Sequence, residues 1–377
     1  MAPLGLYIHL PYCASRCPYC DFFAQPYEPG PAQALIPALL RHLALVAPRA
    51  NGRALSHVYL GGGTPSLWPV RAIARIIAAA AELIGLAPGC EITLEANPGS
   101  LGAAKLARLR AAGVNRLSLG VQSFSPGLLQ TLGRRHTPAD VNRAVAQARR
   151  AGFANLSLDL IYGLPGQGVD DARRDLMAAL ELTPDHLSYY ELTLAPETPF
   201  GRRYAKGRPP LPDEDAILAM EDQALDLAQA AGLMRYEVSN FARPGHECRH
   251  NADTWRGGDY LAIGPGAHGH RDGVRWAMVA DVAAYLAGVA AGAEPLAWRE
   301  ELSGDQRALE LVMLGLRTTA GVDLAACERL IARPLAWAWA EPLAEIQARG
   351  WARQKGRLLV PTALGLRLAD AAAGLFA

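Results

Sequence analysis

The chain has 377 residues, 51% of them hydrophobic and 19% charged, with a formal net charge of +1 at pH 7. This length exceeds one average domain, and the apolar content supports a large buried core and excludes a disordered chain. The near-neutral charge gives no general attraction to nucleic acid or to an acidic membrane. The first residues lack the basic region of a signal peptide, and no apolar run of about 18 residues is free of charge, so we expect neither a signal peptide nor a membrane-spanning helix.

Short apolar runs alternate with longer helical patterns along the first half of the chain. Strands are predicted at 6–10, 57–60, 91–95, 116–121, 155–162 and 186–192. Helices are predicted near 32–47, 70–85, 103–112, 138–151 and 169–182. This alternation predicts an α/β fold with a parallel sheet and right-handed crossovers. Six such units predict a partial (β/α)6 barrel, with its functional loops at the C-terminal ends of the strands.

The later part of the chain has a different pattern. A helix is predicted at 213–232, followed by a strand at 235–238. Beyond 300, helices are predicted at 303–316, 322–330 and 335–349, short strands around 351 and at 358–360, and a last helix at 362–375. This order resembles a small winged-helix-like α+β domain. We therefore divide the chain into a barrel (1–235), an extension (236–300) and a C-terminal domain (301–377).

Winged-helix modules often bind DNA, which is one interpretation of the C-terminal pattern. Acidic residues such as Glu328, Glu341 and Asp370 are mixed among its arginines, so no basic face stands out. A packing or lid role is therefore favoured, and we expect no nucleic-acid partner.

Three cysteines, Cys13, Cys17 and Cys20, directly follow the first predicted strand. Three closely spaced thiolates can hold three irons of a 4Fe–4S cluster and leave the fourth iron open to a small molecule. The alternatives are a structural zinc site or a disulfide, but zinc requires a fourth ligand nearby, and the next cysteine is Cys90. The spacing is typical of radical S-adenosylmethionine (SAM) proteins. Because oxidation damages an open cluster, the reducing cytoplasm is the expected compartment.

Polar or Gly-rich segments follow the other predicted strands. The run 61–65, Gly-Gly-Gly-Thr-Pro, could bring backbone N–H and C=O groups close to the amino and carboxylate groups of a ligand, although a Gly triplet alone is also a tight turn. Glu95, Gln122, Arg134 and Asp159 fall at or near strand ends, where a barrel binds its ligands, although each could also form an ordinary salt bridge.

A resemblance to a known family rests on four runs of the sequence, at 7–22, 61–66, 120–124 and 159–167. They closely resemble the coproporphyrinogen dehydrogenase-like radical SAM group, and the resemblance covers nearly the whole chain. It implies that the three cysteines hold a 4Fe–4S cluster. It also implies that SAM is contacted by Tyr7, Tyr19, Gly62, Gly63, Thr64, Glu95, Gln122, Arg134 and Asp159.

Two branches of this group differ next to the cysteines. The porphyrinogen-decarboxylating branch has a fourth cysteine two residues after the third and a longer N-terminal extension, whereas this chain has Phe22 there and twelve residues before Cys13. The chain is therefore similar to the haem-chaperone branch. That similarity implies haem as a ligand, respiratory haem proteins at the membrane as acceptors, and a cytoplasmic location, including the inner face of the membrane. It leaves open whether the chain forms a homodimer and whether it is an enzyme.

A second segment supports the haem-chaperone branch. His250, Asn251 and Trp255 are similar to a His-Asn-x-x-Tyr-Trp motif associated with haem, and imidazole is a good axial ligand for haem iron. Thr254 replaces the Tyr of the motif, so a contribution from that phenol is missing. The alternative role for His250 is that of a structural histidine, hydrogen-bonded near the barrel rim.

Other cysteines and histidines have less defined roles. Cys248 could be an alternative soft ligand, although a buried free cysteine is commoner. Cys90 and Cys327 lie in apolar patterns and are expected in the core. We expect the remaining histidines of this region in Gly-rich loops and assign them no role: His246, His268 and His270.

Two other functions compete with haem trafficking. One is oxygen-independent coproporphyrinogen III dehydrogenase chemistry, in which reductive SAM cleavage produces a radical that abstracts hydrogen from a porphyrinogen propionate inside the barrel. Phe22 and the short N-terminus count against it. The other is a SAM-sensing winged-helix regulator, which would bind DNA in a salt-dependent way.

Overall fold

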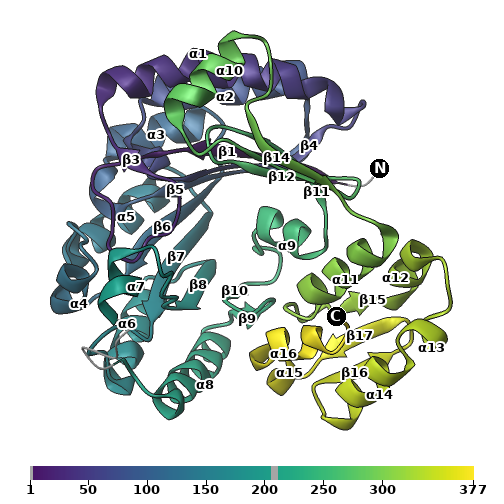
Figure 1. Cartoon of the computed structure of the whole chain (residues 1–377). Helices are drawn as coiled ribbons and strands as arrows, with labels where there is room; N and C mark the ends of the chain where they lie inside the picture. Colours follow the sequence, from purple (N-terminus) through teal and green to yellow (C-terminus); the bar gives the residue numbers. More distant parts are fainter. Residues whose placement is uncertain (1–2, 205–210) are drawn as a thin grey trace.

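The computed structural model describes residues 3–204 and 211–377, and its centre is one large sheet (Figure 1). Six parallel strands form the middle of this sheet: β1 (Leu4–Leu10), β4 (Leu55–Gly62), β5 (Leu86–Ala96), β6 (Arg116–Gln122), β7 (Asn155–Tyr162) and β8 (His186–Glu191). The helices that follow them are α1 (Pro29–Val46), α2 (Val70–Leu83), α3 (Ala103–Ala111), α4 (Pro126–Thr131), α5 (Pro138–Arg150), α6 (Val169–Glu181), α7 (Pro199–Tyr204) and α8 (Glu214–Ala230). The predicted α/β fold with a partial (β/α)6 barrel is confirmed.

Shorter strands extend this sheet at both edges. Next to β1 lie β11 (Asp259–Ile263), which is parallel to it, and the antiparallel strands β12 (His268–Arg271), β13 (Val274–Met278) and β14 (Leu296–Glu301). Next to β8 lie the antiparallel strands β10 (Asn240–Ala242) and β9 (Met234–Arg235). In the described residues the sheet thus has twelve strands, in the order β14-β13-β12-β11-β1-β4-β5-β6-β7-β8-β10-β9. Between β10 and β11 lies helix α9 (Arg249–Trp255), and between β13 and β14 lies α10 (Val282–Ala290).

The two faces of the sheet differ in polarity because side chains alternate along a strand. On β1, Leu6, Ile8 and Leu10 are fully buried in the main hydrophobic core, which also takes in Leu39 of α1. Tyr7 points to the other face, where its ring stacks on a side chain of α9. The inner face of the barrel is therefore the one that can carry polar and aromatic groups for a site.

Helix α1 is a core helix by its packing. Within the described residues, the segment Pro29–Ala50 is the one stretch long and apolar enough to cross a membrane, with a mean hydropathy of 1.2, and half of it is buried inside the fold. Its residues Leu35, Leu39 and Leu43 are fully buried in the main core. The apolar character of α1 is thus accounted for by its contacts within the protein.

Residues 301–377 form what we call the C-terminal module, which lies below the open side of the barrel in Figure 1. Its helices are α11 (Gly304–Gly315), α12 (Leu324–Ile331), α13 (Leu335–Ala338), α14 (Ala340–Ala348), α15 (Ala363–Arg367) and α16 (Ala369–Gly374). A small sheet of β15 (Val322–Asp323), β17 (Leu358–Pro361) and β16 (Ala352–Lys355) completes it. Val312, Cys327 and Ile346 are fully buried in its separate core, and the predicted winged-helix-like α+β character is confirmed.

The C-terminal module contacts the barrel at several places, among them α8 and the β9–β10 hairpin. The backbone N–H of Val238 donates to the carbonyl of Arg317 over 2.9 Å. The guanidinium of Arg367 lies 3.0 Å from the carboxylate of Glu221 on α8. The division at 235 and 300 stays a prediction, because these contacts describe how the parts pack and not where each begins.

Several predicted elements differ from the structure. The strand expected at 235–238 is wrong, because β9 and β10 form a hairpin and Glu237 lies in its turn, where its carboxylate accepts hydrogen bonds from Ser239 and Asn240. The helix expected at 335–349 is broken between α13 and α14, since Pro342 would clash with the carbonyl of residue 338 in a continuous helix. The chain before α12 pairs as β15, and Asp323 caps the helix that follows.

Strands β11 to β14 are absent from the predicted elements. His268 and His270, expected in loops, lie on β12. The polar and Gly-rich sequence of β12 has no strand periodicity, and pairing with β13 holds it extended.

Candidate functional site

The cysteine loop begins where β1 ends. A two-stranded parallel sheet, β2 (Tyr12–Cys13) with β3 (Gln25–Pro26), brings the two ends of the loop together. The N–H of Gln25 donates to the carbonyl of Pro11 over 2.7 Å, and the N–H of Tyr27 donates to that of Cys13 over 2.8 Å. Cys13, Cys17 and Cys20 are free, partly exposed thiols on this short closed loop. The predicted juxtaposition of the three sulfur atoms on one loop is therefore present.

The Gly-rich loop after β4 lies directly against the cysteine loop. The N–H of Gly63 donates to the carbonyl of Leu10 over 2.9 Å, and the N–H of Thr64 donates to that of Tyr12 over 2.8 Å. A Cβ atom on Gly63 would lie 2.7 Å from the backbone oxygen of Tyr12. Gly62 has a φ of +106°, which side chains disfavour. Glycine is thus required for these two loops to approach each other.

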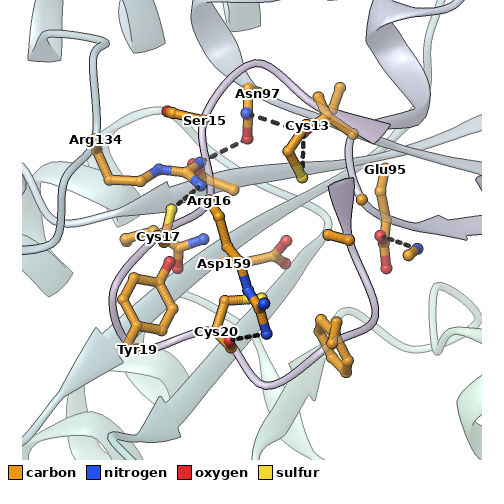
Figure 2. A pocket seen from close by; sticks show the side chains of 18 of the residues that line it. Cys13, Ser15, Arg16, Cys17, Tyr19, Cys20, Glu95, Asn97, Arg134 and Asp159 are labelled. Atoms are coloured by element: carbon orange, nitrogen blue, oxygen red, sulfur yellow. Dashed lines mark hydrogen bonds between the residues drawn. The ribbon is translucent and has the colours of Figure 1, made fainter. Parts of the chain in front are cut away.

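A chain of hydrogen bonds joins two of the cysteines (Figure 2). Arg134 places Nη1 3.7 Å from the Sγ of Cys17 and donates from Nη2 to the Oδ1 of Asn97 over 2.6 Å. The amide of Asn97 donates to the hydroxyl of Thr64 over 3.4 Å, and that hydroxyl donates to the Sγ of Cys13, also over 3.4 Å. The sulfur atoms of the loop are therefore held from the ends of β4 and β5 and from the segment between α4 and α5.

These loops surround a cavity of about 160 Å³ at the C-terminal ends of the strands, lined by all three cysteines. Eight of the nine side chains or glycines predicted to contact SAM also line it: Tyr19, Gly62, Gly63, Thr64, Glu95, Gln122, Arg134 and Asp159. Tyr7 is not in that lining. It lies deeper in the barrel, where its hydroxyl is 2.9 Å from the Nδ1 of His9. The position at the mouth of the barrel is the one that the partial-barrel prediction requires.

Other lining residues were not predicted as contacts, among them Asn97, Ser118, Gly120 and Tyr190. Tyr190 donates from its hydroxyl to the Oε1 of Gln122 over 2.9 Å, and Gln122 itself has a left-handed φ of 68° after the bulge at the end of β6. Alternation along β6 and β8 places Ser118 and Tyr190 on the inner face, so the strand register was the available signal. Asn97 depends on contacts that no local pattern reveals.

Two partly buried carboxyl groups, of Glu95 and Asp159, line the cavity. Burial raises the pKa of Glu95 to about 7, while hydrogen bonds from the Tyr59 hydroxyl (2.8 Å) and the Gly62 N–H (3.2 Å) act in the opposite direction. Burial also raises the pKa of Asp159, against hydrogen bonds from the Ser118 hydroxyl at 3.0 and 3.1 Å. The carboxyl groups are thus partly satisfied acceptors that a ligand with donor or cationic groups would stabilise.

Burial disfavours the thiolate form of two thiols of the loop. Burial raises the pKa of Cys20 to about 11 and also raises the pKa of Cys13, which the Thr64 hydroxyl and the Arg134 cation counteract. Metal ligation needs thiolates, so binding of a cluster would release protons. Across residues 3–204 and 211–377, no three His, Cys, Asp or Glu side chains converge as ligands of one metal ion.

His250 lies on α9, is partly exposed and packs among rings of the barrel. Its ring centroid is 4.8 Å from that of Tyr59, 5.3 Å from His57, 5.6 Å from Tyr260 and 5.7 Å from Tyr7, on which it stacks at 11°. Burial lowers the pKa of His250 to about 3, so its imidazole is neutral. Its Nδ1 atom is buried and has no hydrogen-bond partner among the described residues.

The other residues of the motif on α9 are more accessible. Asn251 and Trp255 are partly exposed, and Trp255 lines a different cavity, of about 550 Å³, near the C-terminal module. Cys248, just before α9, is fully buried, and burial raises its pKa to about 12. The expectation that Cys248, Cys90 and Cys327 are buried is confirmed. The assignment of His250, Asn251 and Trp255 to haem stays a prediction.

Comparison with known proteins agrees with this geometry. The chain matches the family model of the Radical SAM superfamily over residues 7–178 and that of the HemN C-terminal domain over residues 302–368. It is similar in structure to coproporphyrinogen III oxidase (HemN) from Escherichia coli, described as a radical SAM enzyme, with a TM-score of 0.87 and 25% identity over 100% of this chain and 90% of that chain. The partial barrel, the three-cysteine loop and these matches define a radical SAM protein.

Sequence relatives narrow this class. The chain is 39% identical to "Heme chaperone HemW" of Mycobacterium tuberculosis, over 98% of this chain and 93% of the relative. It is 44% identical to "Heme chaperone HemW" of Escherichia coli strain K12, over 71% of this chain and 70% of the relative. The chain belongs to the HemW family of radical SAM proteins, as the sequence resemblance predicted. Radical SAM membership implies a 4Fe–4S cluster and SAM as cofactors.

Proposed function

We propose that this chain is a haem chaperone that binds a 4Fe–4S cluster, SAM and haem, and delivers the haem to respiratory haem proteins at the membrane. The observation that carries the proposal is the closed loop of three free thiols facing a cavity at the mouth of a radical SAM barrel. The haem part is supported by the name of its relatives, which are described as heme chaperones.

The donor set fits the proposed cluster. Cys13, Cys17 and Cys20 are all partly exposed, line one cavity and form no disulfide. Thr64 and Arg134 direct hydrogen-bond donors at two of the sulfur atoms, and such donors stabilise a negatively charged thiolate. When bound, the cluster would supply one iron without a protein ligand, at which SAM could coordinate.

The proposed SAM contacts come from the rest of the cavity. Gly62 and Gly63 offer backbone groups beside the cysteine loop, while Glu95 and Asp159 offer partly buried carboxyl groups to the cationic or hydroxyl groups of the ligand. Tyr19, Thr64, Gln122 and Arg134 would complete the lining. Tyr7 would act on these residues only indirectly, because it packs behind the cavity.

The proposed haem contacts belong to the inner side of the barrel and α9. His250, Asn251 and Trp255 are assigned to haem through the motif alone. Rings of Tyr7, Tyr59 and Tyr260 crowd the imidazole of His250 and its Nδ1 atom is buried, so ligation through that nitrogen would require α9 or its neighbours to move. Transfer of haem would take place in the cytoplasm or at the inner face of the membrane, with a homodimer as one assembly to be tested.

A second function is favoured by one observation, namely the TM-score of 0.87 with a coproporphyrinogen III oxidase. Phe22 opposes it, since it stands two residues after Cys20, where the decarboxylating branch has a cysteine, and its side chain is 62% exposed. The phenyl ring cannot replace a thiol in ligation or proton transfer.

One sample can separate these functions. Anaerobically reconstituted chain should bind haem in a saturable way and should not convert coproporphyrinogen III in the presence of SAM and a reductant. Conversion of coproporphyrinogen III with no saturable haem binding would reverse the assignment. The absence of both, in protein with an intact cluster, would reject both functions.

A further inference from the structure

A separate cavity of about 330 Å³ lies where the antiparallel edge of the sheet, the end of α9 and helix α11 meet. Figure 1 shows α9 between the β11–β14 edge and the C-terminal module, on the open side of the barrel. The cavity is not part of the SAM-side cavity, and the two share no lining residue. Its volume is within the range of small-molecule sites, roughly 300–1000 Å³.

The walls of this cavity are largely aromatic or apolar. Tyr260 of β11, Trp298 of β14 and Leu314 of α11 line it from three sides, and Gly257 and Gly258 form a wall without side chains. Trp298 is 42% exposed, so its indole is accessible to a ligand in the cavity. Flat apolar walls with a glycine face suit a planar macrocycle.

His268 of β12 is an exposed metal-ligating side chain that lines this cavity. Its ring packs edge-on against Trp298, with centroids 5.8 Å apart. In the part of the chain that the structure describes, neither nitrogen of its ring makes a hydrogen bond. Partial burial lowers the pKa of His268, so at neutral pH the imidazole has the neutral form that binds iron. His270 also lines the cavity, but its Nδ1 is 3.0 Å from the carbonyl of Gly258.

A cation and a small side chain complete the surroundings. Arg275 lines the cavity and pairs with Glu300 at 2.7 Å and Glu310 at 2.9 Å, while its Nε atom is buried without an acceptor among the described residues. Glu310 also lines the cavity, so this wall is an ion pair in which the guanidinium already has its carboxylate partners. Thr254, which stands where the haem motif has Tyr, also lines the cavity and leaves it more open than a phenol would.

His250 and His268 thus differ in the property that axial ligation requires. Four rings, of Tyr7, His57, Tyr59 and Tyr260, pack around His250, whose Nδ1 atom is buried and whose side chain is only partly exposed. His268 faces open space beside an exposed indole. Tyr260 lies between the two histidines, with its ring edge-on to His250 and also in the lining of the cavity.

We propose that this cavity binds haem, with His268 as an axial ligand of the iron and Trp298 against the macrocycle, while His250 supports the packing of Tyr260 behind it. This inference rests on the proposed function, in that the chain must bind haem at all. It moves the ligand from α9 to the neighbouring strand β12 and makes the α9 segment one wall of the site.

The test is titration of the full-length chain with ferric haem, followed by visible absorption and electron paramagnetic resonance. His268→Ala should lose the histidine-ligated spectrum and bind at least tenfold more weakly, and added imidazole should restore the spectrum by entering the space left. His246→Ala, a loop histidine outside the cavity, is the matched control. His250→Ala should keep the wild-type spectrum.

A second pair of variants reports on the macrocycle. Trp298→Ala should weaken haem binding severalfold, whereas Trp337→Ala, which removes an indole that is 83% exposed on the C-terminal module, should not. A wild-type spectrum and affinity in His268→Ala would overturn this site. Loss of the histidine-ligated spectrum in a folded His250→Ala would also overturn it. Either result would leave the proposed function intact. Wild-type chain that binds no haem would remove the proposed function itself, and this inference with it.

Discussion

The guanidinium of Arg134 lies against the sulfur of Cys17, with Nη1 3.7 Å from Sγ. Its other terminal nitrogen is held by the Oδ1 of Asn97 at 2.6 Å and the carbonyl of Gly120 at 2.5 Å. The cation therefore belongs to the barrel strands and not to the cysteine loop. A fixed positive charge at this place favours thiolate over thiol in the loop and would counter the negative charge of a bound cluster.

Replacing Arg134 by Leu should weaken retention of the cluster. A hydrogen bond to a charged group contributes about 2 kcal/mol. The variant should therefore lose iron to a chelator roughly thirtyfold faster than the wild type, or lose a larger fraction of it. The neighbouring Arg135→Leu is the control, because Arg135 is exposed and has no contact with a loop sulfur in the described residues. Equal iron retention in the two variants would contradict the role given to Arg134.

Loss of any loop cysteine should abolish the cluster, whereas loss of a core cysteine should not. Cys20→Ala should show no cluster absorption after anaerobic reconstitution. Cys90→Ala should keep it and should lose only about 1 kcal/mol of stability, because Cys90 is buried in the main core. Iron and sulfide analysis checks both, and a full cluster in Cys20→Ala would exclude that thiol as a ligand.

Gly63→Ala should displace the cysteine loop. The added Cβ would lie 2.7 Å from the oxygen and 2.8 Å from the nitrogen of the Tyr12 backbone, and backbone cannot rotate away as a side chain can. We expect a loss of about 1–3 kcal/mol in unfolding free energy and a lower cluster yield. Gly30→Ala is the control, because nothing lies within 4 Å of its added Cβ. Identical stability and yield in the two variants would contradict the close approach of the loops.

Glu95→Gln should change how the stability of the cofactor-free chain depends on pH. The pKa of Glu95 is raised from 4.5 to about 7, so between these values the folded carboxyl keeps a proton that the unfolded one has released. The folded state then binds more protons, and the stability contributed by Glu95 is present below that window and falls as pH rises through it. Gln removes this dependence, and above pH 7 the variant should be more stable by about 1–2 kcal/mol, after loss of the Gly62 hydrogen bond.

Urea unfolding at pH values below, within and above that window measures the effect of Glu95→Gln. Glu82→Gln, an exposed position on α2, should follow the wild-type curve. A variant whose stability falls with pH as steeply as the wild type would show that Glu95 is ionised normally in the folded chain.

Sequence patterns were sufficient for the parallel half of the fold. β7 has the predicted bounds, Asn155–Tyr162, because Leu156, Leu158 and Leu160 alternate with polar residues at the strand period of two. The antiparallel edge could not be found in this way. Every residue of β14 (Leu296–Glu301) is exposed, so no burial pattern marks it, and only pairing with β13 makes it a strand.

The candidate site was predictable where local spacing determines it. Cys13, Cys17, Cys20 and the Gly-rich loop are short-range motifs, and the parallel sheet brings them together as predicted. Asn97 was missed because its role comes from hydrogen bonds to Arg134 and Thr64, which are distant in sequence.

Histidines were the least predictable part of the site. The sequence does not show that rings from three strands pack around His250, nor that pairing of β12 with β13 directs His268 into a cavity. Both facts depend on the register of the strands, which residue types alone do not specify.

The most direct test of the proposed cofactor centre is electron paramagnetic resonance of the anaerobically reconstituted and reduced chain, recorded before and after addition of SAM. Three thiolates that leave the fourth iron open predict a 4Fe–4S signal, of up to one cluster per chain, that shifts when SAM is added. A chain that takes up iron and sulfide but gives a signal indifferent to SAM, or gives none at all, would contradict the centre.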